Sequence, residues 1–153
     1  MFDILAYLVH RYWNLGDLPD VDSLSRHLSA VGFETGEIDQ AVDWLSGLSS
    51  ARGSIELGLQ TVASDAIRCY SSEEEQQIDR EARGYLYFLE SAGVLDSVQR
   101  EVVLDRISAL NDSEIEIDQV KLIVLMVLWS QGPRPDNLIF EELFATHSWQ
   151  SLH

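Results

Sequence analysis

The chain has 153 residues, 46% of them hydrophobic, which is enough for a sizeable core in one domain or two small ones. Acidic residues number 26 against 10 basic ones, the formal net charge is −16, and Lys121 is the only lysine. Nucleic acids and anionic membranes attract lysine and arginine, so this balance disfavours both as direct partners. The single cysteine, Cys69, excludes an internal disulfide and a cysteine-based zinc cage.

The N-terminal end carries no basic and apolar leader of the secretory kind, so we expect a cytoplasmic protein. The acid excess is explained by solubility alone, and it is also what an acidic surface for a basic protein partner would require.

The first part of the chain predicts three helices. Residues 2–13 place Phe2 and Leu5 on one helical stripe, and residues 21–31 follow an aspartate N-cap and end at Gly32. A third helix starts at Thr35 and ends where residues 49–54 break the pattern. Its inward face is expected to carry Ile38, Ala41, Val42, Leu45 and Leu48.

Residues 55–70 are the hardest part of the sequence to interpret. Two short apolar runs, Ile55–Leu57 and Ile67–Tyr70, are compatible with short strands or with a packed loop.

Helical signals return at Ser71, which forms a capping-box pattern with Glu74. We expect one helix from there to Gly93, with its inward face formed by Ile78, Ala82, Tyr85, Leu86 and Leu89. A further helix begins at Asp96, with Gln99 three residues on, and a final amphipathic helix covers residues 136–145.

Every side chain from Leu122 to Trp129 is apolar, so the helix expected over residues 120–130 has no face for water. A membrane span needs about 20 apolar residues, and this run has eight. We therefore expect it to be the buried central helix of the C-terminal part.

Together these elements predict an all-α protein of two small helical units and about seven helices, with an irregular or short β middle segment. The expected division is an N-terminal three-helix unit of residues 1–52, an irregular connector of residues 53–70 and a C-terminal helical unit of residues 71–153.

The two helices of residues 21–48 have the spacing of a helix-turn-helix motif. The second would present Glu37, Asp39 and Asp43 and no basic residue to DNA, which argues against groove reading. Gly32-Phe33 followed by Ala41–Leu45 looks instead like a ubiquitin-associated module, in which a Gly-Phe loop and the last helix grip a protein.

No catalytic, metal or cofactor site is expected. The acidic run from Asp112 to Asp118 lacks the glycine and the glutamate of an EF-hand, because Ile117 and Ile123 occupy those positions. The four histidines show no metal-ligand spacing, and no phosphate-binding or nucleophile motif occurs.

The whole chain resembles the Smg family of small proteobacterial proteins. Blocks that carry the resemblance run in order through the sequence: Met1–Leu8, Gly32-Phe33 with Ala41–Leu45, Arg68–Glu74, Gly84–Glu90, Val102–Arg106, Leu122–Leu128, Glu141–Phe144 and Leu152-His153. Cys69 departs from the aliphatic residue expected there, and the tail around Trp149 looks particular to this chain. The resemblance implies no known activity and no functional residues. It implies only a link to DNA processing and topology, through the genes that lie beside those of the family.

We expect a protein-binding adaptor or regulator, not an enzyme, with no cofactor and an unidentified protein partner. Its candidate partner surface is Phe33, Trp44 and Trp149. The alternatives are a nucleic-acid-associated factor, which would bind with steep salt dependence, and an enzyme with a carboxylate-based site in a concave pocket.

Overall fold

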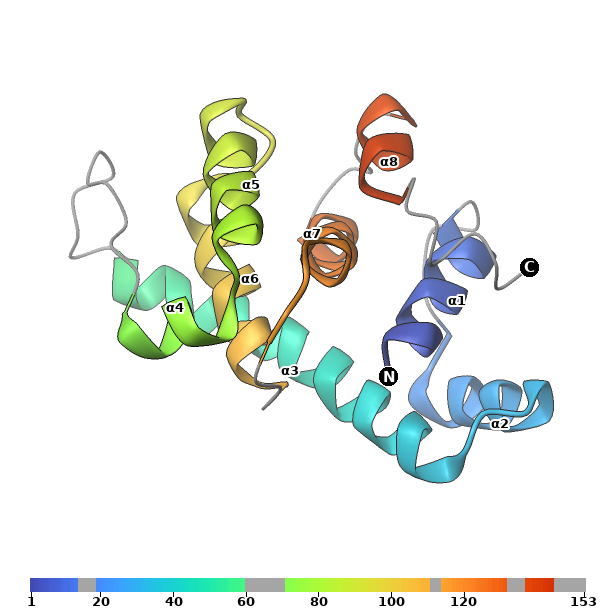
Figure 1. Ribbon diagram of the computed structural model, residues 1–153. Coiled ribbons are helices and arrows are strands. Elements are labelled where there is room, and N and C mark those ends of the chain that lie inside the picture. The colour runs from blue at the N-terminus through green and yellow to red at the C-terminus, as the bar shows by residue number, and fades with distance from the viewer. Residues whose placement is uncertain (14–18, 60–70, 111–113, 132–136, 145–153) are drawn as a thin grey trace.

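A computed structural model describes residues 1–13, 19–59, 71–110, 114–131 and 137–144. These ranges contain eight helices (Figure 1): α1 (Phe2–Tyr12), α2 (Val21–Val31), α3 (Thr35–Leu59), α4 (Ser72–Gln77), α5 (Arg80–Ser91), α6 (Ser97–Ser108), α7 (Ile117–Gln131) and α8 (Asn137–Phe144). The prediction of an all-α protein is confirmed.

Helix α7 lies at the centre of the molecule (Figure 1), with the long α3 running beneath it. Its side chains from Leu122 to Leu128 have exposed fractions of only 0–8%. Helix α1 packs on one side of it and α5 and α6 on the other, while α8 lies above. The expected central helix is therefore confirmed, and it starts slightly earlier than residue 120.

The prediction of a short β middle segment is wrong. Helix α3 continues through the expected break at residues 49–54 as far as Leu59, so residues 53–59 of the expected connector are helical. Within the described ranges the only β pairing is one isolated parallel bridge between Ile78 and Ile115. Cys69 and the rest of residues 60–70 lie outside the described residues.

The serines near the expected break are accommodated within α3 because their hydroxyls hydrogen-bond to carbonyls of the same helix. Ser46 Oγ donates to the Val42 carbonyl at 2.9 Å, and Ser50 Oγ donates to the Ser46 carbonyl at 3.4 Å. Packing of α3 against α6 and α7 then outweighs the low helix propensity of serine and glycine.

The predicted single helix of residues 71–93 is instead two helices. Ile78 is extended, with φ −110° and ψ 122°, and only 1% of it is exposed. Asp79 then caps α5 by accepting a hydrogen bond from the Ala82 amide at 2.7 Å. The chain therefore leaves the helix for one residue to bury Ile78 beside Ile115.

The predicted helix ends are confirmed at three places. Ser71 with Glu74 and Asp96 with Gln99 each form a complete capping box, in which side chain and backbone satisfy each other. Gly32 ends α2 with φ 115°, a left-handed conformation that suits glycine.

The larger core cluster draws on α1, α3, α5, α6, α7 and α8, while a smaller cluster fills the space between α1, α2 and α3. Helix α3 thus contributes to both. The division into folding units of residues 1–52 and 71–153 stays a prediction. Within the described part of the chain, no helix is long and apolar enough to cross a membrane.

Candidate functional site

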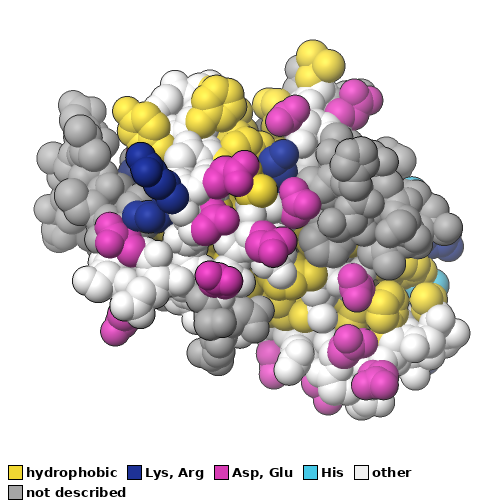
Figure 2. Space-filling model, in the orientation of Figure 1, with side chains coloured by type: hydrophobic (Ala, Val, Ile, Leu, Met, Phe, Trp, Pro, Cys, Tyr) yellow, Lys and Arg dark blue, Asp and Glu magenta, His cyan; other side chains and the backbone are white. Residues whose placement is uncertain are grey.

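Two helices at the top of the molecule expose large apolar side chains. On α5, Tyr87 is 64% and Phe88 60% exposed, and on α8 Leu138 is 74% exposed. Hydrophobic side chains gather over these helices, above a band of acidic ones (Figure 2). We call this region the α5–α8 surface and define it as Tyr85, Tyr87, Phe88, Lys121, Leu138 and Glu142.

Lys121 of α7 joins the two sides of the α5–α8 surface. Its Nζ lies 5.1 Å from the centre of the Tyr85 ring on α5, within the range of a cation–π contact. The same Nζ lies 4.0 Å from Glu142 Oε1 on α8. Tyr85 in turn stacks on Phe88, with ring centres 6.3 Å apart. Lys121, the only lysine of the chain, therefore contacts both the aromatic side of this surface on α5 and the acidic side on α8.

Tyr85 has an unusual hydroxyl. The oxygen is buried and makes no hydrogen bond within the described part of the protein. Burial, and secondarily the nearby Glu142 carboxylate, raise the pKa of Tyr85 to about 12, because both disfavour a phenolate. The side chain is neutral at physiological pH, and its O–H donor has no partner among the described residues.

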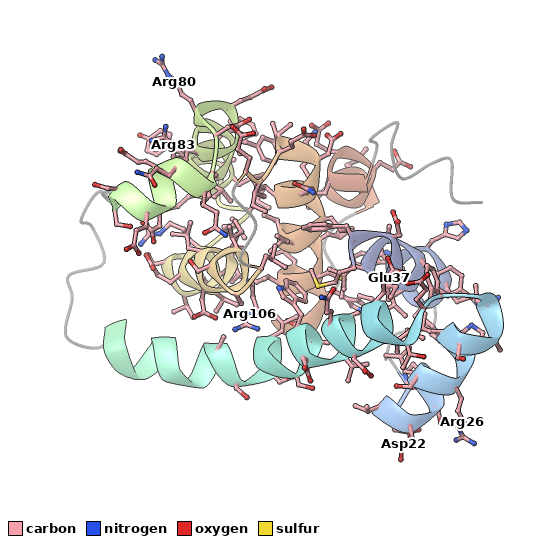
Figure 3. All side chains as sticks on the ribbon, turned by 60° about the horizontal axis from the view of Figure 1, so that its bottom comes forward. Asp22, Arg26, Glu37, Arg80, Arg83 and Arg106 are labelled. Atoms are coloured by element: carbon pink, nitrogen blue, oxygen red, sulfur yellow. The ribbon has the colours of Figure 1, made fainter. Side chains whose placement is uncertain are left out.

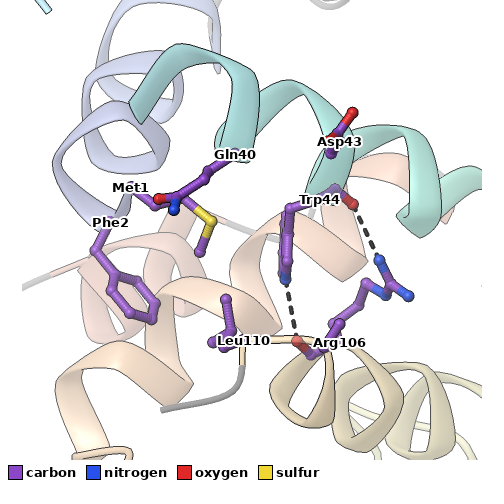
Figure 4. Close-up of a pocket in the computed structure, with 8 residues that line it drawn as sticks. Met1, Phe2, Gln40, Asp43, Trp44, Arg106 and Leu110 are labelled. Carbon is purple, nitrogen blue, oxygen red and sulfur yellow. Dashed lines mark hydrogen bonds between the residues drawn. The ribbon is translucent and has the colours of Figure 1, made fainter. Parts of the chain in front are cut away.

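A pocket of about 540 Å³ lies where α1, α3 and α6 meet (Figure 4). Its lining residues are Met1, Phe2, Gln40, Asp43, Trp44, Arg106, Ala109 and Leu110. Trp44 lies in the middle of them, with Phe2 and Leu110 on one side and Arg106 on the other.

Trp44 and Arg106 lock α3 to α6 by a reciprocal pair of hydrogen bonds. Trp44 Nε1 donates to the Arg106 carbonyl at 3.0 Å, and Arg106 Nη1 donates to the Trp44 carbonyl at 3.1 Å. Arg106 Nε and Nη2 donate to Asp105 Oδ2, at 3.0 Å and 2.7 Å. Figure 3 shows this guanidinium lying against α3, whereas Arg80 points away from α5.

Gly47 makes room for that arginine. A Cβ at this position would clash with Nη1 of Arg106. The absence of a side chain on α3 therefore lets the guanidinium approach the helix backbone.

The structure places Phe33 and Trp44, two of the three sequence-predicted site residues, apart from the α5–α8 surface. Trp44 is only 4% exposed. Phe33 is half-buried and packs edge-on against Tyr7, which also hydrogen-bonds His27 Nε2 at 2.8 Å. Trp149 lies outside the described residues. A partner surface formed by these three residues stays a prediction.

Sequence reasoning missed Tyr87 and Phe88, although a signal for them exists. The stripe of Ala82, Leu86 and Leu89 fixes the buried face of α5, and both aromatic residues fall outside it. Two adjacent aromatic residues on the polar side of an amphipathic helix indicate an exposed patch.

The described residues contain no group of three or more potential metal ligands. The groups that the α5–α8 surface does offer are flat rings, an aliphatic side chain, one cation and one carboxylate. This arrangement is suited to gripping another molecule by apolar and ionic contacts.

Comparison with known proteins identifies the family. The model described as "Protein of unknown function (DUF494)" matches residues 1–153. The chain is 44% identical to the Protein Smg homolog of Methylibium petroleiphilum over 153 residues, all of both chains. It is also 44% identical to that of Leptothrix cholodnii over the same length, again all of both chains. Identity to that of Aromatoleum aromaticum is 43% over 145 residues, which are 95% of this chain and 93% of the relative. Comparison with solved structures found no match. The resemblance read from the sequence is confirmed, and the chain belongs to the Smg family.

Proposed function

We propose that this Smg family member is a cytoplasmic adaptor or regulator that binds another protein through the α5–α8 surface. The observation that carries the proposal is the exposure of Tyr87, Phe88 and Leu138, each at 60% or more, on two helices that Lys121 connects.

Exposure of this kind does little for folding, because each side chain leaves most of its apolar area in water. Aromatic residues gathered on a surface are the usual anchors of protein interfaces. Three large apolar side chains on α5 and α8 thus support binding as the role of this region.

The charge on the α8 side of the α5–α8 surface narrows the chemistry of the partner. Glu141 and Glu142 are exposed on α8, and the net charge of the chain is −16. Lys121 is already engaged by Tyr85 and Glu142. We infer a partner that presents apolar side chains among basic ones, since like charges facing each other would oppose docking. The genes that lie beside those of the family suggest a DNA-processing pathway. A protein of that pathway is the first partner to test.

A crosslinking experiment tests the proposal. A photoreactive amino acid replaces Phe88 in one variant and Ser29, which is exposed on α2, in a matched control. Both are expressed in native cells, irradiated and treated with nuclease before analysis. We expect one protein to crosslink at position 88 and not at 29, irrespective of nuclease.

Substitution outside the crosslinking position supplies the second control. Tyr87→Ala should abolish the crosslink at position 88, while Val31→Ala removes an apolar side chain that is 48% exposed on α2 and should leave it intact. Loss of the crosslink on nuclease treatment would instead favour a nucleic-acid-associated factor. Equal crosslinking at 29 and 88 would refute a dedicated surface.

A further inference from the structure

The solvent-facing side of α5 is basic as well as aromatic. Arg80 precedes Tyr87 by about two helical turns, so both lie on the same side of the helix, and both are exposed. Arg83 lies one turn after Arg80, and its Nη1 is 3.4 Å from Glu75 Oε1 on α4. Arg80 points away from α5 (Figure 3) and makes no ion pair with another described residue. It is therefore the cation that α5 offers to another molecule.

Helix α8 carries the opposite charge. Glu141 and Glu142 are both exposed, and Glu141 makes no ion pair with a described residue. Figure 2 shows basic side chains beside α5, on the side away from α8, apolar ones in the middle and acidic ones over α8. The α5–α8 surface therefore lies between a basic edge, Arg80 with Arg83, and an acidic edge, Glu141 with Glu142.

This order of charges is self-complementary. A two-fold axis through the apolar middle turns the basic edge of one molecule onto the acidic edge of another, so that the same contact forms twice. Arg80 of each copy would then face Glu141 of the other. The net charge of −16 opposes any arrangement in which acidic faces meet, whereas this crossed one places opposite charges together at both ends.

We propose that the α5–α8 surface binds a second copy of this chain in the crossed, two-fold arrangement. A second copy has the chemistry inferred above for a partner, because it presents the apolar Tyr87 next to the basic Arg80. Association of the two copies would also remove Tyr87, Phe88 and Leu138 from water. The dimer is then the form in which the binding surface is covered, a consequence that rests on the proposed function, whereas the dimer itself does not.

Sedimentation velocity of the purified full chain at increasing concentrations tests the proposal. We expect the unchanged chain to pass from monomer to dimer. Arg80→Glu and Glu141→Arg each place like charges at both contacts, so each should weaken self-association by about tenfold or more. Arg26→Glu makes the same change in net charge as Arg80→Glu, but on α2 at the opposite end of the molecule (Figure 3), and should leave the dimer intact. Circular dichroism checks that each variant folds.

Mixing the two charge reversals separates a direct contact from a general effect. In a pair formed by Arg80→Glu and Glu141→Arg, opposite charges face each other again at both contacts. A fluorescein-labelled Glu141→Arg chain should therefore sediment as a dimer when unlabelled Arg80→Glu is added. With unlabelled Arg26→Glu, one of the two contacts stays repulsive, so the labelled chain should dimerise less.

An unchanged chain that stays monomeric would overturn the proposal. So would a dimer that both charge reversals leave intact, or one that mixing does not restore. Because the purified chain contains no partner, these results are independent of the crosslink at position 88 in native cells. A crossed dimer that crosslinks to no other protein would refute the proposed function alone. A monomer that crosslinks to another protein would refute the dimer alone.

Discussion

Helix α7 and the neighbouring α5 treat their apolar side chains in opposite ways. From Leu122 to Leu128, α7 buries everything it has, whereas α5 buries Ala82, Leu86 and Leu89 and leaves Tyr87 and Phe88 in solvent. Since burial is what makes apolar residues stabilise a fold, the first set explains why the chain folds. The second set remains to be explained by what the protein binds.

Substitution in α7 should have the largest effect. Leu125 is fully buried, so Leu125→Ala removes methyl groups and leaves a cavity that the packed neighbours fill only in part. We expect a loss of about 2–5 kcal/mol in the free energy of unfolding, measured by urea denaturation. A loss below about 0.5 kcal/mol would mean that α7 is not the core.

A smaller effect is expected where α3 meets α6. Trp44→Phe keeps an aromatic ring but removes the N–H that donates to the Arg106 carbonyl. We expect a loss of about 1–2 kcal/mol, the usual range for a partly buried hydrogen bond and the acceptor that it leaves behind. Stability equal to that of the unchanged chain would show that the hydrogen bond does not fasten these helices.

Tyr85 should give a pH-dependent effect at the border between core and surface. Its pKa is raised to about 12 from an ordinary value near 10, so the folded state favours the neutral phenol. That contribution is complete below about pH 10 and is lost as the pH rises toward 12.

Tyr85→Phe, compared with the unchanged chain in urea titrations from neutral pH to about pH 11.5, isolates this contribution. Only the unchanged chain should lose stability through Tyr85. Because the side chain is half-buried and partly screened by water, we expect a difference below about 1 kcal/mol. Parallel pH curves for the two proteins would contradict the raised pKa.

Structural features that depend on residues close together in the sequence were predictable. The capping boxes at Ser71 and Asp96, the left-handed Gly32 and the wholly apolar α7 each depend on local spacing or on composition. Each occurs where the residues indicate it.

Features that depend on distant parts of the chain were not predictable. Helix α3 runs past Ser49 because it packs along α6 and α7, and Ile78 leaves the helix to pair with Ile115. The binding partner of the Trp44 indole is the carbonyl of a residue 62 positions away. The contacts of Lys121 with Tyr85 on α5 and Glu142 on α8 likewise became visible only in the fold.

The most direct test measures folding and binding in the same pair of variants. Tyr87→Ala/Phe88→Ala alters the α5–α8 surface, and Val21→Ala/Val31→Ala alters exposed apolar residues of α2. The free energy of unfolding of each variant should differ from that of the unchanged chain by no more than about 0.5 kcal/mol per substitution, as is usual for surface changes. Only the α5 pair should lose the partner captured by the crosslinker, here placed at Leu138 on α8. If the α5 pair instead unfolds the protein by several kcal/mol, or keeps its partner, the α5–α8 surface is not the binding surface.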